Sequence, residues 1–248
     1  MIDAWVDVLA NCVGLVEVSY VKNVALRVIQ EMPSPKNPLA RRMLGNRLVT
    51  TVAMNLPEES HVEEPLVFRL VMSMCQDPNY TVRRDGAIFF KEYLKKNSKE
   101  LVGTERLEDF YLPEIYELLN DEESYVRIEV IEAMLEILEH LQLETIEQQF
   151  IPNFLKALEI KNNHDEIVSR MAEIIGKVVH KLSAFDLHLK YKEQILNFYK
   201  AMVEHRDPEN NKMGIYNLPC FHLLYKDKVG RPPPGTAATQ STQSTGPI

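Results

Sequence analysis

Cysteine is scarce in this chain of 248 residues. The three cysteines, Cys12, Cys75 and Cys220, stand far apart and form no Cys-x-x-Cys pair, which argues against a disulfide framework and against a clustered zinc site. The seven histidines form no His-Glu-x-x-His motif and no short cluster with cysteine. His164 precedes two acidic residues in a polar turn, where we interpret it as a solvated loop residue and not as a metal ligand. We therefore expect no metal and no other cofactor.

Glycine is also sparse. The nine glycines are scattered singly, so the sequence offers no glycine-rich loop of the kind that binds nucleotide phosphates. The Gly-x-Ser-x-Gly motif of a nucleophile elbow is absent from the sequence as well. Catalysis would depend on residues that only folding brings together, and we expect that the protein is not an enzyme.

Long apolar runs are missing. No window reaches the roughly 18 uninterrupted apolar residues that favour a membrane-spanning helix. The N-terminal segment carries Asp3 and Asp7 where a signal peptide would carry positive charge. These features predict a soluble, cytoplasmic protein without a membrane partner.

Basic residues are too few for a nucleic-acid surface. The net charge is −8, whereas binding to a phosphate backbone needs clustered lysine and arginine that replace condensed counterions. Residues 100 to 150 contain 15 acidic residues but only Arg106 and Arg127 as basic residues, a local balance of −13. We expect that a partner docking on this middle segment carries basic groups.

What the sequence does contain is helical periodicity over most of its length. Apolar residues recur at spacings of three and four, and no convincing strand alternation is present. In residues 128–141 an apolar stripe opposes a glutamate face, with Ile128, Ile131, Leu135, Leu138 and Leu141 against Glu129, Glu132, Glu136 and Glu139. Polar breakers interrupt the helices at intervals of about twenty residues, which predicts helical hairpins.

Similar turn sequences recur at a nearly fixed offset. Asp77 and Asp121 lie 44 positions apart, as do Arg83 and Arg127. Four predicted turns start at Asp77, Asp121, Asn163 and Asp207, with offsets of 44, 42 and 44 residues. The first helices of these hairpins are expected near Pro65, Tyr111, Phe150 and Tyr191, and the second near Thr81, Tyr125, Ile167 and Lys212. Such periods are typical of HEAT and armadillo repeats, which bury their apolar faces by stacking on their neighbours.

The turn residues have a chemical interpretation. An aspartate just before the second helix can accept hydrogen bonds from unpaired backbone amides at the helix start. Arg83 and Arg127 are expected to reach an acidic group or a carbonyl oxygen on the adjoining repeat, which gives both a structural role. For Arg127 we expect a place inside the hairpin or at the interface with the preceding repeat, bonded to Asp77 or Asp121. The third copy has Ser169 in place of the arginine.

Three segments carry a family resemblance. The segment FYLPEIYELLNDEESYVRIEVIEAMLEIL (110–138) resembles the HEAT repeats of the protein phosphatase 2A scaffold subunit. The segments SMCQDPNYTVRRD (73–85) and NNKMGIYNLPC (210–220) are similar to those of the regulatory subunit 4 family of protein phosphatase 4. This resemblance implies an all-α, right-handed α-solenoid of antiparallel HEAT-like helix pairs. It also implies a non-catalytic scaffold that binds a protein phosphatase 4-like catalytic subunit. A structural HEAT adaptor in a larger cytoskeletal or ciliary assembly is the alternative.

The resemblance also implies where a partner would bind. In HEAT scaffolds of this kind, the turns inside successive helix pairs line up along one ridge that touches the partner. Carried over to this sequence, the partner-binding residues are expected to be Asp77, Asn79, Tyr80, Arg84, Asp121, Glu122, Glu123 and Tyr125.

The two ends of the sequence differ in character. Residues 1–229 are expected to form the solenoid, whereas residues 230–248 are rich in proline, threonine, serine and glutamine and are predicted to be a disordered tail. The apolar N-terminal segment around Trp5 either packs on the next helices or leaves an exposed edge for docking or self-association.

Overall fold

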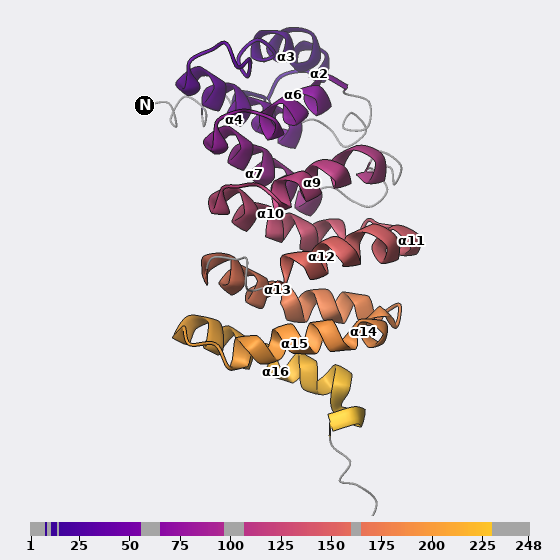
Figure 1. Ribbon diagram of the computed structural model, residues 1–248. Coiled ribbons are helices and arrows are strands. Elements are labelled where there is room, and N and C mark those ends of the chain that lie inside the picture. The colour runs from indigo at the N-terminus through magenta and orange to yellow at the C-terminus, as the bar shows by residue number, and fades with distance from the viewer. Residues whose placement is uncertain are drawn as a thin grey trace, which may run out of the picture.

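The computed structural model describes residue 8 and the ranges 11–13, 15–55, 65–96, 107–159 and 165–229. Every regular element in these ranges is a helix (Figure 1). The predicted tail at 230–248, the segment around Trp5 and the predicted third turn at Asn163 lie outside the described residues. None of the helices in the described ranges has both the length and the apolar character needed to cross a membrane.

The described helices form five successive pairs along one axis. In each pair the second helix is longer than the first, and the first helix is interrupted in every pair except the second, where α6 is continuous. The first helices comprise α2 (Val18–Tyr20), η1 (Val21–Ala25) and α3 (Leu26–Ile29); α6 (Pro65–Cys75); η2 (Leu107–Tyr111) and α9 (Leu112–Leu119); α11 (Leu143–Thr145), η3 (Ile146–Phe150) and α12 (Ile151–Ala157); and α14 (Leu187–Lys190) and α15 (Lys192–Val203). The second helices are α4 (Leu39–Asn55), α7 (Tyr80–Lys96), α10 (Ser124–Ile137), α13 (Asp165–Ser183) and α16 (Pro208–Val229).

The second helices stack on one another through the molecule. Helix α4 contacts α7, α7 contacts α10, α10 contacts α13, and α13 contacts α16. Figure 1 shows these layers following one another from the indigo N-terminal end to the yellow C-terminal end. Within the described ranges, each pair packs on the pair before it and the pair after it, which is the arrangement of an α-solenoid and confirms the predicted fold class.

The apolar core runs continuously between the layers. Helix α10 illustrates this continuity, because it contacts α9 of its own pair, α7 of the preceding pair and α13 of the following pair. Its buried surface is wider than the stripe predicted from the sequence, since Val130, Ala133 and Ile137 are buried in addition to Ile131 and Leu135. Burying one such aliphatic side chain contributes about 1.5–3 kcal/mol, so packing between repeats supplies the main stabilisation.

An aromatic cluster joins the second and third pairs. The ring of Tyr111, at the end of η2, lies 5.5 Å from Phe68 of α6, 5.4 Å from Phe90 of α7 and 6.0 Å from Tyr93 of α7, measured between ring centroids. Aromatic contacts of this kind add about 0.5–1.5 kcal/mol beyond the area that they bury. The π-helical turn η2 therefore packs against both helices of the preceding pair.

Three of the four predicted turns are confirmed, at residues 76–79, 120–123 and 204–207. The starts of α6, α7 and α10 fall within one residue of the prediction, whereas the first helix of the last hairpin begins with α14 at Leu187, four residues before the predicted Tyr191. The first helices of the two middle hairpins begin earlier than predicted, at Leu107 and Leu143. Each contains a π-helical segment, whose hydrogen bonds span five residues and shift the apolar spacing away from the 3.6-residue period used to place it.

Candidate functional site

The two turns that carry the predicted site are shaped by side-chain hydrogen bonds to the backbone. The amide of Asn79 donates to Asp77 Oδ1 at 2.8 Å, and the amide of Thr81 donates to Asn79 Oδ1 at 3.0 Å. In the second turn the amide of Glu123 donates to Asp121 Oδ1 at 2.9 Å. Both aspartates thus hold the turn that precedes the helix, and Asn79 is the residue that caps α7. This corrects the expectation that these two aspartates cap the helix directly.

The turn before α16 follows the capping prediction more closely. Asp207 Oδ1 accepts hydrogen bonds from the amides of Glu209 and Asn210, at 3.0 and 3.1 Å. These amides belong to the first turn of α16, which starts at Pro208. A capped helix start explains why α16 begins four residues before the predicted position, Lys212.

Successive turns are tied together by two arginine–aspartate pairs, which we call the arginine ladder. Arg42 Nη1, from α4, donates to Asp77 Oδ2 at 3.0 Å. Arg83 Nε and Nη2, from α7, donate to Asp121 Oδ2 and Oδ1 at 2.6 and 2.9 Å. Arg83 Nη1 also donates to the backbone oxygen of Asp77 at 3.0 Å. Each arginine therefore joins one repeat to the turn of the next.

The ladder removes both aspartates from the surface. Their side chains are 0% exposed for Asp77 and 7% exposed for Asp121. Burial alone would raise the pKa of Asp121, but the hydrogen bonds from Arg83 and from the Glu123 amide outweigh burial and place the pKa below its ordinary value. These two carboxylates, included among the predicted partner-binding residues, are oriented into the protein and stabilise the turns.

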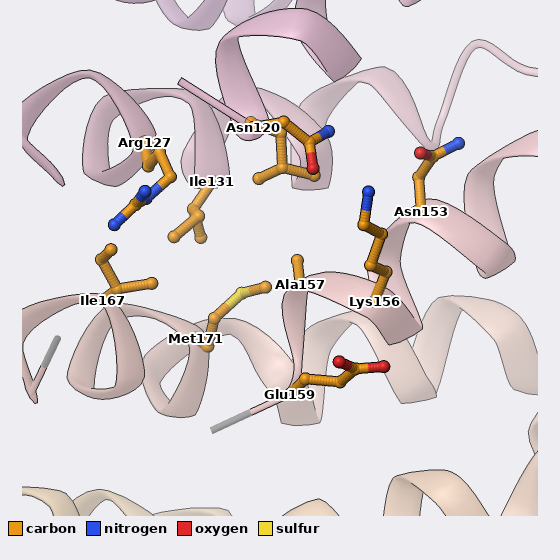
Figure 2. Close-up of a pocket in the computed structure, with 10 residues that line it drawn as sticks. Asn120, Arg127, Ile131, Asn153, Lys156, Ala157, Glu159, Ile167 and Met171 are labelled. Atoms are coloured by element: carbon orange, nitrogen blue, oxygen red, sulfur yellow. The ribbon is translucent and has the colours of Figure 1, made fainter. Parts of the chain in front are cut away.

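Arg127 differs from Arg83 despite the shared local sequence. Its Nη1 donates to the backbone oxygen of Asp121 at 2.8 Å, as Arg83 does to Asp77 in the preceding turn. Its side chain lies beside Ile167 of α13, in the following repeat (Figure 2). The expected bond between Arg127 and Asp121 is therefore present within the hairpin, through the backbone oxygen of Asp121. The expected contact with the preceding repeat is replaced by one with the following repeat, because the carboxylate of Asp121 is held by Arg83.

The other predicted residues form a surface that we call the turn ridge, in which Tyr80, Arg84, Glu122 and Tyr125 are exposed and Asn79 and Glu123 are partly buried. Tyr80 and Tyr125 come from successive repeats and are 41% and 54% exposed, and their rings stack at a centroid distance of 6.5 Å. Arg84 is half-exposed and is oriented by Glu129, to whose Oε1 its Nη2 donates at 2.6 Å. The side chain of Glu122 is 84% exposed.

Part of the acidic excess in the middle of the chain is neutralised internally. Glu129 of α10 pairs with Arg84 and Lys91 of α7, and Glu132 pairs with Lys91 at 3.3 Å and with Arg170 of α13 at 3.0 Å. Burial would raise the pKa of Glu129, but hydrogen bonds from Arg84 and Lys91 hold it below its ordinary value. These carboxylates connect three stacked helices, and they are less available to a basic partner than their number in the sequence indicates.

Sequence reasoning missed the structural role of Arg42. It is buried, and it holds Asp77. A signal for it was present, because Arg42 precedes Arg83 by 41 residues, close to the repeat period.

Sequence reasoning also missed the structural role of Asn217, which lies in a segment quoted only for its resemblance. Its Nδ2 donates to the backbone oxygens of Ala172 and Met213 at 2.6 and 2.8 Å, and its Oδ1 accepts from the Gly176 amide at 3.1 Å. A Cβ atom on Gly176 would lie 2.3 Å from Asn217 Oδ1, so this approach of α16 to α13 depends on a glycine.

The described ranges contain no cluster of three or more histidine, cysteine or acidic residues that could hold a metal ion. The three cysteines are unpaired; Cys75 is buried between helices, whereas Cys12 is exposed.

Comparison with curated proteins supports the resemblance drawn from the sequence. No model of a known protein family matches the chain. The chain is 24% identical over 204 residues, 81% of its length, to serine/threonine-protein phosphatase 4 regulatory subunit 4 of Homo sapiens, and equally to that of Mus musculus. It spans 22% of the length of these relatives. The resemblance to regulatory subunit 4 is confirmed at this level of identity.

Solved structures with a similar fold are also helical solenoids. A chain from a structure of Kap95p with RanGDP matches with a TM-score of 0.63 and 16% identity, over 86% of this chain and 26% of that one. Kap121p matches with a TM-score of 0.57 and 14% identity, over 90% of this chain and 22% of that one. An engineered protein matches with a TM-score of 0.57 and 13% identity, over 87% and 88% of the two chains. At these identities the matches show the α-solenoid fold alone.

Proposed function

We propose that this chain is a non-catalytic regulatory scaffold that binds the catalytic subunit of a protein phosphatase 4-like Ser/Thr phosphatase through the turn ridge. Sequence similarity to a phosphatase regulatory subunit supports the scaffold role. A stack of helix pairs offers an extended surface on which a partner can contact several repeats at once.

The observation that carries the choice of surface is the exposed Tyr80–Tyr125 pair. The residues that dominate the energy of protein interfaces are enriched in tyrosine, tryptophan and arginine. Here two tyrosines and Arg84 lie on adjacent repeats, with the rings stacked on each other. The ridge therefore combines apolar area with polar edges, which is the composition of an interface centre.

The turn ridge is also held in place before a partner arrives. Arg84 is oriented by Glu129, and the backbone on which Tyr125 sits is fixed by Asp121 and the arginine ladder. Ordering one flexible side chain on binding costs about 0.5–1.5 kcal/mol, so groups that are already ordered retain more of their contact energy. Glu122 and Glu123 add negative charge at one side of the ridge, which favours a partner with basic groups.

Direct binding to the recombinant catalytic subunit of protein phosphatase 4 tests this proposal. We expect that Tyr80→Ala with Tyr125→Ala weakens binding by at least about tenfold, because a tyrosine at an interface centre commonly contributes about 2 kcal/mol or more. The matched control is Tyr216→Ala, an exposed tyrosine on α16 away from these turns. Equal loss of binding in ridge and control variants, or no binding by the wild-type chain, would overturn the proposal. Circular dichroism confirms that each variant keeps its helix content.

A further inference from the structure

A cavity of about 160 Å³ lies where α10, α12 and α13 meet, at the junction between the third and fourth helix pairs. Its apolar part is formed by Ile131, Ile167 and Met171, as Figure 2 shows. Pockets for cofactors and drug-sized ligands usually measure about 300–1,000 Å³. This cavity is therefore suited to a group the size of one or two amino-acid side chains.

Within the described residues, the arginine ladder has two carboxylate pairs and no third pair at this cavity. Arg42 and Arg83 each bind the aspartate of the next turn, and Arg127 stands at the corresponding place for a third pair. The sequence has Asn163 at the position 42 residues after Asp121, where the repeat period would place the next aspartate. Asn163 itself lies outside the described residues.

The guanidinium of Arg127 is left with unused hydrogen-bonding capacity. Its Nη1 is bound to the Asp121 backbone oxygen, but its Nε is buried and has no hydrogen-bond partner within the described ranges. Arg127 also helps to lower the pKa of Asp121, although the hydrogen bond from Arg83 is the larger of these two effects. A buried cationic donor without a partner is costly, and an incoming carboxylate removes that cost.

A second cation lines the opposite side of the cavity. In Figure 2 the side chain of Lys156 points toward the space between Asn120 and Asn153, with Ile131 and Met171 separating it from Arg127. The one carboxylate among the described lining residues belongs to Glu159, so the charged lining carries a net positive charge of one. Residues 100–150 by contrast balance to −13, which makes the cavity a local exception.

We propose that this cavity binds a short segment of a partner polypeptide in which an apolar side chain is flanked by acidic residues. One carboxylate of the partner segment binds Arg127, in the way that the carboxylate of Asp121 binds Arg83. The other carboxylate of the segment binds Lys156. The apolar side chain lies on Ile131 and Met171. Arginine and carboxylate groups match in a planar, paired hydrogen-bond geometry, which gives the site its preference for acidic residues. This site is separate from the turn ridge and does not depend on the proposed phosphatase partner.

The test uses a blocked tripeptide, acetyl-Glu-Leu-Glu-amide, added to the full chain and followed by amide chemical shifts in NMR spectra. The matched control peptide is acetyl-Gln-Leu-Gln-amide. We expect that the acidic peptide shifts the side-chain amides of Asn120 and Asn153 and the backbone amide of Met171. We expect that the glutamine peptide binds about tenfold more weakly, because a hydrogen bond to a charged group contributes at least that factor.

Two variants locate the site. Arg127→Gln and Lys156→Gln should each weaken binding of the acidic peptide about tenfold, whereas the exposed cations Arg27 and Lys200, changed to glutamine, should leave it unaltered. If Arg127→Gln disturbs the fold, the exposed Lys156 variant decides the question. Equal binding of the two peptides, unaltered binding by Lys156→Gln, or no binding by the wild-type chain would overturn the proposal. Binding of inorganic phosphate without binding of the acidic peptide would overturn the assignment to a polypeptide.

Discussion

The Arg83–Asp121 pair offers a quantitative test of how the repeats are held together. Replacing Arg83 with methionine keeps most of its apolar stem but removes the donors that bind Asp121 and the Asp77 carbonyl. Removing one partner of a buried ion pair costs about 3–5 kcal/mol, because the other charge stays buried without compensation. The two side chains here are 12% and 7% exposed, so water reaches them in part. We expect a loss of about 2–4 kcal/mol.

A double-mutant cycle separates the pair from its surroundings. Asp121→Asn keeps an oxygen that can accept from the Glu123 amide but removes the charge that Arg83 binds. We expect a coupling energy of about 2 kcal/mol between the two substitutions, measured by urea unfolding followed by the helical circular dichroism signal. Arg84→Met is the control, because the half-exposed Arg84–Glu129 pair should contribute no more than about 1 kcal/mol. A cost below about 0.5 kcal/mol for Arg83→Met, or no coupling, would refute the structural role of the ladder.

Further predictions concern pH, packing and association. The pKa of Asp121 is lowered in the folded state, so the ionised carboxylate stabilises the fold above the ordinary pKa of aspartate, and this stabilisation is lost as the pH falls below about 4. Asp121→Asn should therefore flatten this part of a profile of stability against pH. Gly176→Ala should destabilise the wild-type chain by about 1–3 kcal/mol in urea unfolding, because the added Cβ meets the side-chain amide of Asn217. In the Asn217→Ala variant, which lacks that amide, the same substitution should be stabilising, because alanine favours a helix more than glycine does. Destabilisation in both backgrounds would contradict this contact. Glu122→Gln with Glu123→Gln should slow association with the phosphatase catalytic subunit at low salt without changing the free energy of unfolding, since charge attraction is screened over about 8–10 Å at physiological ionic strength. Unchanged association rates would exclude these two residues from the interface.

The turn positions could be predicted from the sequence because the chemistry that sets them is local. Asp77, Asp121 and Asp207 each accept a hydrogen bond from an amide two residues later, so a short stretch of sequence contains the whole cause of the turn. The starts at Leu107 and Leu143 could not be placed in this way. Both helices contain a π-helical segment, in which the hydrogen bonds span five residues, so the apolar residues no longer follow the 3.6-residue period.

The division of the candidate site into buried and exposed residues depends on contacts between repeats. Asp121 and Glu122 are adjacent, are chemically alike and both pair with Arg83, yet the side chain of Asp121 is 7% exposed and that of Glu122 is 84% exposed. Arg83 and Arg127 each follow a valine, but Arg83 binds the carboxylate of Asp121 in the next turn, whereas Arg127 binds the backbone oxygen of Asp121 in its own turn. Such differences arise from contacts between residues of different repeats, which a local sequence pattern does not specify.

The role of the turn ridge is tested most directly by hydrogen–deuterium exchange of the chain, alone and saturated with the recombinant catalytic subunit of protein phosphatase 4. The proposed function predicts slower exchange in peptides that cover residues 76–84 and 120–128, which carry the turn ridge, and unchanged exchange in peptides from the C-terminal half of α16. Exchange that slows in α16 while both turns remain unchanged, or no change anywhere at saturating concentrations, would contradict the assignment of the turn ridge as the binding surface.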